Sequence, residues 1–369
     1  MQDQEDLLYH LAFSCFLGIG PVTFQKLVAH FGSAKKAYTI SEKQLSDILR
    51  RDIFEKFINY RRDFKPDKQL ELFNKRGIHT IHQNHDYYPY QLKNISDPPI
   101  CLYIKGNLKT ICFEEPPQGD YFFGIVGTRR PTSYGMQITK KFTSDLCRAG
   151  FVIVSGMAMG VDAIAHKTAI DEGGKTVAVL GCGVDVVYPN VNKYLFNEII
   201  KKGGIIVSEF PPGRTVLKGL FVARNRIVSG LSQGVCIIEG TNTSGSLITA
   251  RFAAEQGKDV FAPPVPITSE MSQAPNLLIK QGAKFITSVS DILEEYQMKI
   301  VPAKEKDILI NCDLEQKKIL ELIIQEPCSI DDIVNKTHLL ITEILKTMSI
   351  FEINGIVEKN SEGKYQVRR

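Results

Sequence analysis

Short, almost continuous runs of Val, Ile and Phe alternate along the chain with longer segments whose apolar residues recur at helical spacing. The apolar runs occupy residues 122–126, 151–154, 176–180, 205–207, 235–238, 260–262 and 284–286. Helical spacing extends over residues 133–149, 162–172, 192–202 and 246–256, and a glycine follows each of these segments. Apolar strands that alternate with helices are typical of a parallel sheet covered on both faces. The pattern therefore predicts an α/β fold with a doubly wound, Rossmann-like and mostly parallel sheet.

Residues 1–75 have a different pattern, in which the apolar side chains keep helical spacing. The stretch Leu17-Gly18-Ile19-Gly20-Pro21 interrupts it with a tight turn, as in a helix-hairpin-helix or SAM-like unit. The amides of such a turn can face a phosphate backbone, but a lone Gly-x-Gly turn is weak support, and a purely structural unit is favoured. We predict a helical domain over 1–75, followed by a connector and the Rossmann-like domain over 76–298.

The pattern changes again after residue 298. Residues 299–307 are polar and predict a linker, helices are expected at 314–324, from 329 and at 341–353, and two runs at 355–358 and 364–367 predict a hairpin. Three helices and a hairpin are the elements of a winged helix, which we predict over 310–369. Its third helix carries charges of both signs, so a protein-contact or regulatory role is favoured over base reading.

Composition narrows the class of protein. The 369 residues are 43% hydrophobic and 23% charged, which is close to the average of globular proteins and excludes a disordered chain. No apolar run approaches the roughly 18 residues of a membrane-spanning helix. The first residues are acidic where a secretory signal would be basic. We therefore predict a cytoplasmic protein without a membrane partner.

The charge is unevenly distributed, although the net charge is only +4. Residues 121–290 hold 18 Lys and Arg against 11 Asp and Glu, and this excess favours a polyanionic partner. The eight cysteines form no Cys-x-x-Cys pair. His79, His82 and His85 recur every third residue but lie in an irregular polar segment. The sequence therefore predicts no metal site and no other cofactor.

Small and basic residues follow the predicted strands at their carboxyl ends, where doubly wound sheets bind their ligands. Gly127-Thr128-Arg129-Arg130 follows the first parallel strand, and Ser155-Gly156 follows the second. Amides at a helix N-terminus can hold a phosphate, and guanidinium groups suit phosphate oxygens. A plain strand–helix turn is the alternative interpretation of the first loop. Lys175 stands at the opposite, entering end of its strand, so we expect it to point away from the ligand.

Three further groups are candidates for phosphate contacts. Ser244-Gly245-Ser246 opens a helix, where its hydroxyls and amides could bind a phosphate, cap the helix or do both. Arg224-Asn225-Arg226 is expected at a helix edge near the strand ends, with a surface ion-pair site as the alternative. Asn192-Lys193 follows the third strand, and Lys193 is either a phosphate contact or a solvated helix residue.

Five motifs occur in a fixed order between residues 124 and 290. They are Gly127-Thr128-Arg129-Arg130-Pro131, Ser155-Gly156-Met157-Ala158-Met159-Gly160, Leu180-Gly181-Cys182-Gly183, the run 221–232, and Ser244-Gly245-Ser246-Leu247. They resemble the motifs of the bacterial DNA-processing protein A family, also called DprA or Smf. The resemblance implies a homodimer that binds and protects incoming single-stranded DNA and helps to load the RecA recombinase in natural transformation or homologous recombination. It implies no catalytic residue.

Two rival hypotheses stay open. The first is a nucleotide-binding or nucleotide-cleaving enzyme of a related fold, which would use a glycine-dense loop and an acid. Residues 240–246 lack that glycine density, and Glu239 is the well-placed acid. Asp162 and His166 share a helix face, but without a nucleophile motif we interpret them as a helix N-terminal carboxylate and a packed histidine. The second rival is a scaffold that acts through its winged helix alone.

Overall fold

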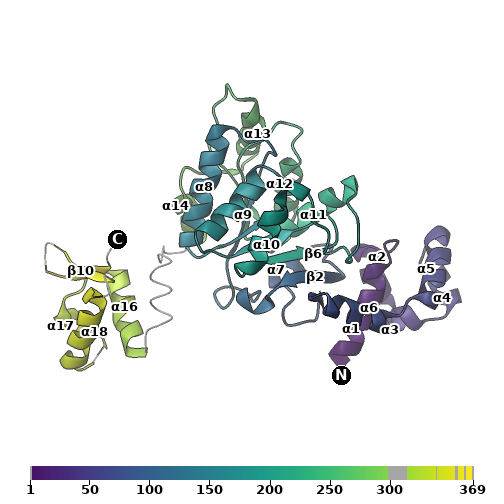
Figure 1. Cartoon of the computed structure of the whole chain (residues 1–369), viewed down its shortest axis with the longest axis horizontal. Helices are drawn as coiled ribbons and strands as arrows, with labels where there is room; N and C mark the ends of the chain where they lie inside the picture. Colours follow the sequence, from purple (N-terminus) through teal and green to yellow (C-terminus); the bar gives the residue numbers. More distant parts are fainter. Residues whose placement is uncertain (1, 298–313, 338, 354–355, 361–362, 368–369) are drawn as a thin grey trace. The chain divides into compact units, whose positions relative to one another are not determined.

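The computed structural model of the chain describes residues 2–297, 314–337, 339–353, 356–360 and 363–367. It divides into two compact units, one of residues 1–147 and 151–296 and the other of residues 148–150 and 297–369 (Figure 1). The predicted linker at 299–307 and the predicted start of the last domain at 310 lie outside the described residues. Within the described ranges, no helix combines the length and the apolar character that crossing a membrane requires.

A nine-stranded sheet forms the centre of the first unit, in the order β1-β2-β6-β5-β4-β3-β7-β8-β9. Its strands are β1 (Ile78–His82), β2 (Cys101–Gly106), β3 (Phe122–Val126), β4 (Val152–Ser155), β5 (Thr176–Val179), β6 (Ile205–Ser208), β7 (Gly234–Ile237), β8 (Asp259–Ala262) and β9 (Lys284–Phe285). The seven strands from β6 to β9 in this order are parallel, which confirms the predicted doubly wound sheet. An antiparallel edge of β1 and β2 extends it.

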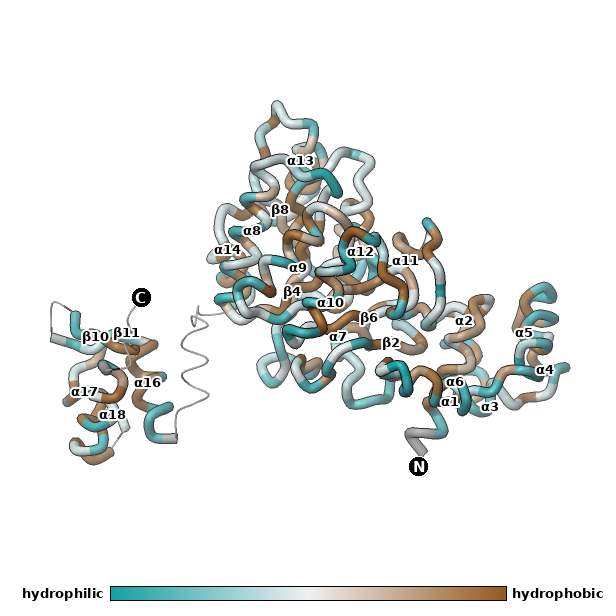
Figure 2. The backbone as a smooth tube through the Cα atoms, in the orientation of Figure 1, coloured by the Kyte–Doolittle hydropathy of each residue, from teal (hydrophilic) through white to brown (hydrophobic). Residues whose placement is uncertain are grey.

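Helices cover both faces of the sheet (Figure 1). They are α7 (Tyr90–Lys93), α8 (Ser133–Arg148), α9 (Val161–Asp171), α10 (Lys193–Lys201), α11 (Lys218–Leu231), α12 (Ser246–Glu255), α13 (Gln273–Lys280) and α14 (Val289–Glu295). Ile227 of α11 and Ala253 of α12 pack with Val177 on one face, whereas Ile199 of α10 packs with Ala178 on the other. Both faces of β5 are thus buried, and the strands form an apolar centre (Figure 2).

The N-terminal helices pack against this sheet. They are α1 (Gln2–Cys15), α2 (Pro21–Phe31), α3 (Ala34–Thr39), α4 (Glu42–Ser46), α5 (Arg51–Asp63) and α6 (Pro66–Lys75). Their core is aromatic, because Phe13 stacks on Phe57 with ring centroids 5.3 Å apart. Both rings belong to the same buried apolar cluster as Tyr103 of β2 and Ile206 of β6. The helical segment therefore shares its core with the sheet.

The second unit has an apolar core of its own. Its described elements are α16 (Leu314–Gln325), α17 (Ile330–Thr337), α18 (Ile341–Ile353), β10 (Val357–Lys359) and β11 (Tyr365–Val367). Ile319, Ile333, Ile344 and Tyr365 lie in one buried cluster. The hydroxyl of Ser329 accepts a hydrogen bond from the N–H of Asp332 at 3.1 Å, so Ser329 caps α17 as the sequence predicted. The order of elements is the expected one, and the winged-helix identity stays a prediction.

Candidate nucleic-acid interface

A cleft of about 730 Å³ opens beyond the carboxyl ends of the central parallel strands. Strand β3 lies between β4 and β7 in the sheet. After β3 the chain first adds β4, β5 and β6 on one side of it, and only then adds β7, β8 and β9 on the other side. Doubly wound sheets bind ligands at such a switch in strand order. The cleft is lined by the loop after β3, the loop after β4, one face of α11 and the start of α12.

The loop between β3 and α8 is held by Glu239, which is fully buried just after β7. The Glu239 carboxylate accepts hydrogen bonds from the backbone N–H of Thr132 at 2.9 Å and from the Thr132 hydroxyl at 2.6 Å. The Glu239 carbonyl oxygen accepts a third bond, from the N–H of Thr128 at 2.8 Å. A side chain at Gly135 would collide with this carboxylate, since its Cβ would lie 2.2 Å from Oε2 of Glu239. The loop is thus fixed at both ends.

These bonds change where a phosphate can bind. The Thr132 hydroxyl accepts a hydrogen bond from the N–H of Gly135 at 3.2 Å and so caps α8. Together with the Glu239 carboxylate, it occupies the helix N-terminus at which the sequence predicted a phosphate. Arg129 and Arg130 are exposed further out on the loop. The side chains of Arg129 and Arg130 are therefore available to an anion, whereas the N-terminus of α8 is already occupied.

Arg224 lies beneath the cleft and is only 5% exposed. Its guanidinium donates hydrogen bonds to the carbonyl oxygens of Gly156 and Val179, at the carboxyl ends of β4 and β5. A Cβ at Gly156 would lie 2.5 Å from the guanidinium carbon, so only glycine lets the chain cross Arg224. Burial lowers the pKa of Arg224, and the nearby carboxylate of Asp162 opposes this change. A buried positive charge therefore underlies the cleft.

Asp162 and His166 of α9 have structural contacts, as we interpreted from the sequence. Asp162 Oδ2 accepts hydrogen bonds from the N–H groups of Gly156 and Ala158 at 3.1 and 3.2 Å, which holds the loop after β4. Nδ1 of the buried His166 lies 2.7 Å from the hydroxyl of Thr176. Burial, with a further contribution from the positive charge of Arg224, lowers the pKa of His166 to about 3. His166 is therefore neutral at physiological pH.

The structure brings most of the predicted contact residues together. Those that line the cleft are Gly127, Thr128, Arg129, Gly156, Arg224, Asn225, Ser244, Gly245 and Ser246. Ser155 and Asn192 lie behind its wall, where the Ser155 hydroxyl donates to the Ile125 carbonyl oxygen at 2.7 Å and the Asn192 amide donates to that of Met157 at 2.9 Å. Arg130 and Lys193 are exposed and do not line the cleft.

Arg226 differs most from the sequence expectation. Arg224 and Arg226 lie in the middle of α11 and not near its end, where the sequence predicted them. Arg226 is 5% exposed and pairs with Asp97 at 2.8 Å and with Glu209 at 2.5 Å. Residues two apart on a helix point about 200° apart, so Arg224 and Arg226 cannot both face the cleft. The ion pair that we named as the alternative is formed, but it is buried.

Sequence reasoning missed Lys218 and Phe221, which line the cleft from α11. They share a helix face with Asn225, because residues three, four and seven apart lie on one side of a helix. That spacing was the available signal. The Phe221 ring lies 5.4 Å from that of Tyr188, between centroids, and Tyr188 is 43% exposed. One wall of the cleft is therefore aromatic.

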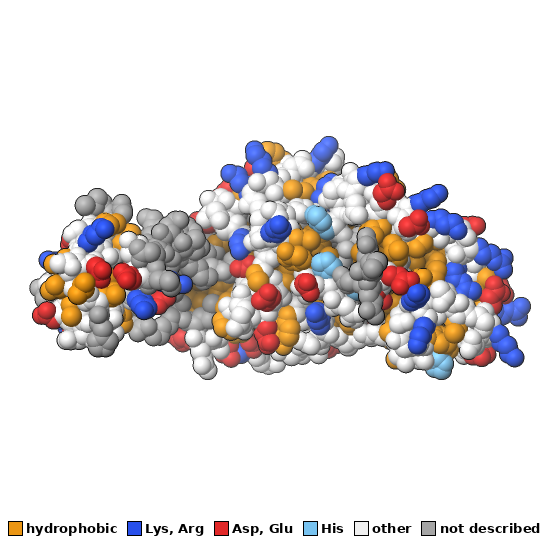
Figure 3. All heavy atoms as spheres, turned by 90° about the horizontal axis from the view of Figure 1, so that it is seen from below, with side chains coloured by type: hydrophobic (Ala, Val, Ile, Leu, Met, Phe, Trp, Pro, Cys, Tyr) orange, Lys and Arg blue, Asp and Glu red, His pale blue; other side chains and the backbone are white. Residues whose placement is uncertain are grey.

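The charge in the cleft differs from the charge on the face of the molecule shown in Figure 3. On the face shown in Figure 3, Lys and Arg side chains are interspersed with Asp and Glu. Among the described residues that line the cleft, three are basic, Arg129, Lys218 and Arg224, and one is acidic, Asp162. That carboxylate already accepts two backbone hydrogen bonds. The cleft therefore suits an anionic ligand.

Known proteins are similar to this chain over most of its length. The sequence profile of DNA recombination-mediator protein A matches residues 79–297. Protein Smf of Synechocystis is 35% identical over an alignment of 397 positions, gaps included, that covers 98% of each chain. DNA processing protein DprA of Bacillus subtilis is 39% identical over 257 residues, which cover 70% of this chain and 82% of that protein.

Crystallographic relatives have the same fold. The X-ray structure of DNA processing protein A (DprA) from Streptococcus pneumoniae aligns with a TM-score of 0.66 and 34% identity, over 78% of this chain and 96% of that one. DNA processing protein A from Helicobacter pylori, whose structure gives insight into its single-stranded DNA binding mode, aligns with a TM-score of 0.52 and 32% identity. That alignment covers 60% of this chain and 95% of the other.

Replacing Glu239 by Gln should destabilise the protein. The amide of Gln cannot accept both Thr132 hydrogen bonds, so one buried donor loses its partner, and the free energy of unfolding should fall by about 1–3 kcal/mol. Urea denaturation of both proteins measures the change. Glu255→Gln is the matched control, because Glu255 is exposed on α12 and has only a surface ion pair with Arg251. Equal losses in the two variants would contradict the role of Glu239.

The buried His166 should make stability depend on pH. Between its folded pKa of about 3 and its ordinary value of 6.5, the unfolded chain binds a proton that the folded chain does not. The free energy of unfolding should therefore fall as the pH falls below 6.5, by up to about 1.4 kcal/mol per pH unit. His166→Gln lacks this contribution. The difference in stability between the two proteins should be constant above pH 6.5 and should change steadily below it.

Proposed function

Because the chain belongs to the DNA recombination-mediator protein A family, we propose that it binds single-stranded DNA in the cleft beyond β3, β4 and β7. The charge of the cleft is the observation that carries this proposal. Arg129 and Lys218 are exposed at the cleft, Arg224 lies below it, and the lining carboxylate of Asp162 is engaged by backbone N–H groups. The H. pylori relative, studied for its single-stranded DNA binding mode, supports the assignment.

The phosphates bind mainly to the two loops that enter helices. Arg129 receives one phosphate, because a guanidinium can donate two parallel hydrogen bonds to its oxygens. The start of α12 receives another at Ser244-Gly245-Ser246, which line the cleft and where the helix dipole favours an anion. The Ser244 hydroxyl also accepts a hydrogen bond from the N–H of Ser246 at 3.3 Å. Gly127, Thr128 and Asn225 line the path between the two phosphates, and the exposed Arg130 and Lys193 lie beside it. Ser155, Asn192 and Arg226 support the loops from behind.

The bases lie against the aromatic wall of Tyr188 and Phe221. Every base has a π face, so stacking on such rings is tolerant of sequence. Phosphate contacts carry no sequence information either. Binding through these two kinds of contact has little sequence preference, as a protein that receives incoming strands of any sequence requires.

The protein acts as a mediator and not as an enzyme. It protects single-stranded DNA and helps to load the RecA recombinase during natural transformation or homologous recombination, as a cytoplasmic homodimer. Dimerisation places two clefts on one strand. The printed names of the relatives, DNA processing protein and recombination-mediator protein, support this role. The RecA contact and the dimer interface are inferred from the family.

A nucleotide-cleaving enzyme is disfavoured by the state of its candidate acid. Glu239 is fully buried, and both oxygens of its carboxylate accept hydrogen bonds from Thr132. A general acid or base must reach the proton that it transfers. Incubation of the protein with nucleoside monophosphates should therefore release no free base above the level of a buffer blank.

Single-stranded DNA should bind more tightly than double-stranded DNA, and binding should weaken steeply with salt. Several phosphate contacts imply a log–log salt dependence with a slope of about −0.7 per contact for a single strand. Fluorescence anisotropy with a labelled oligonucleotide and with its duplex, at several salt concentrations, measures both affinities. A flat salt response, or a preference for the duplex, would contradict binding through phosphates in this cleft.

Arg129→Ala should weaken single-strand binding far more than Lys175→Ala. Arg129 is exposed after β3 at the cleft, whereas Lys175 precedes β5 at the other end of the sheet and pairs with Asp120 at 3.1 Å. Loss of the Arg129 contact should lower affinity roughly ten- to a hundredfold, which corresponds to about 1–3 kcal/mol. Titration at one fixed salt concentration, with circular dichroism as the folding control, tests this order. Equal losses would place the DNA path elsewhere.

A further inference from the structure

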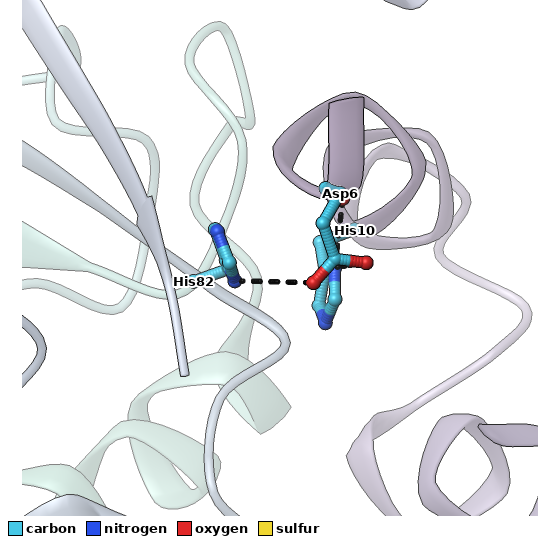
Figure 4. Close-up of side chains that lie close together, drawn as sticks. All are labelled: Asp6, His10 and His82. Carbon is cyan, nitrogen blue, oxygen red and sulfur yellow. Dashed lines mark hydrogen bonds and ion pairs between the residues drawn. The ribbon is translucent and has the colours of Figure 1, made fainter. Parts of the chain in front are cut away.

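Two histidines and an aspartate meet where α1 packs against β1. Asp6 and His10 lie one turn apart on α1, and His82 is the last residue of β1. One oxygen of Asp6 and one nitrogen of each imidazole all lie within 4.8 Å of one another. Figure 4 shows the Asp6 carboxylate beside the His10 ring and facing His82. The two imidazole rings are 4.6 Å apart between centroids.

We propose that Asp6, His10 and His82 form a zinc site that fastens the N-terminal helix to the edge of the sheet. Two imidazole nitrogens and a carboxylate oxygen are a ligand set that zinc accepts, with bonds of about 2.0–2.2 Å. In a tetrahedral site such bonds hold two ligand atoms roughly 3.4 Å apart. Asp6 Oδ2 and His82 Nδ1 are 3.9 Å apart and all three ligand atoms lie within 4.8 Å of one another, so the ligands must draw closer together to bind the ion.

The surroundings fit a metal with one open position. His82 is fully buried and His10 is 6% exposed, whereas the side chain of Asp6 is 28% exposed. An ion can therefore arrive on the side of Asp6, where water supplies the fourth ligand. Imidazole ligands favour zinc over magnesium or calcium, which prefer oxygen.

Hydrogen bonds around the cluster hold the ligands. The backbone N–H of Asn84 donates to Nδ1 of His82 at 3.4 Å, and a metal at this nitrogen would replace that bond. Asn84 donates a hydrogen bond from Nδ2 to Oδ2 of Asp6 at 3.3 Å. Nδ1 of His10 lies 2.9 Å from the carbonyl oxygen of Asp6. When Nδ1 donates to this oxygen, Nε2 carries the lone pair that a metal needs. Metal-bound histidines have such a partner on the other ring nitrogen almost always.

The site explains why the spacing of the histidines was uninformative. His79, His82 and His85 lie near one another in the sequence, but only His82 belongs to the cluster. His79 is the exposed residue of β1. The other two ligands come from α1, which is remote in the sequence. A metal that joins them closes a long loop between the first helix and the first strand, so it should stabilise the folded state.

Zinc binding by the full-length chain tests the proposal. After treatment with a chelator and dialysis against zinc chloride, the wild-type protein should retain one zinc ion per chain and unfold at a higher temperature than the zinc-free protein. Cobalt(II) in place of zinc should give the visible absorption bands of a tetrahedral site. His82→Gln should lose the ion, whereas His79→Gln on the same strand should keep it.

A second variant keeps the test decisive if the buried substitution at His82 impairs folding. Asp6→Asn keeps the shape of the side chain at a partly exposed position. Loss of a hydrogen-bond partner outside the ligands costs roughly 10–100-fold in metal affinity, and loss of the Asp6 ligand should weaken zinc binding by more than this. Absence of stoichiometric zinc from the wild-type protein overturns the proposal. So does equal zinc binding by Asp6→Asn and His79→Gln.

Discussion

The hydrogen bonds between the buried carboxylate of Glu239 and Thr132 tie the loop after β3 to the neighbouring strand β7. They bridge the two sides of the point where the strand order changes direction, which is where the cleft lies. A loop that is already ordered presents Arg129 to a ligand without a further loss of conformational freedom. The affinity of the proposed interface therefore depends on a buried carboxylate that is not among the residues lining the cleft.

Charged residues around the cleft divide into two kinds by burial. Glu239, Arg224, Asp162 and Arg226 are buried, and each has partners on the backbone or in an ion pair. A buried charge without partners is costly, so these residues are committed to holding the loops. The exposed cations are free to exchange water for phosphate. The motifs contain both kinds, because a working site needs the scaffold as much as the contacts.

Residue patterns predicted the parallel core because its strands are short apolar runs that alternate with helices. The pairing of β1 and β2 with this sheet was not foreseen, because β2 pairs with β6 about a hundred residues further on and pairing over such a distance leaves no local pattern. Arg226 shows the same limit at the site. Its burial depends on Asp97 and Glu209, from two remote segments. The helical period separates Arg224 from Arg226, but the sequence motif predicted both of them at the ligand.

The contacts that the cleft offers fit the proposed role of a mediator, which must both hold and release a strand. Guanidinium groups, amides and aromatic rings bind features that every nucleotide has, so the free energy is spread over several weak contacts. Contacts of this kind can be exchanged one at a time, which lets a second protein displace the strand progressively. An ordered cleft with exchangeable contacts thus suits the proposed transfer of DNA better than a single deep site would.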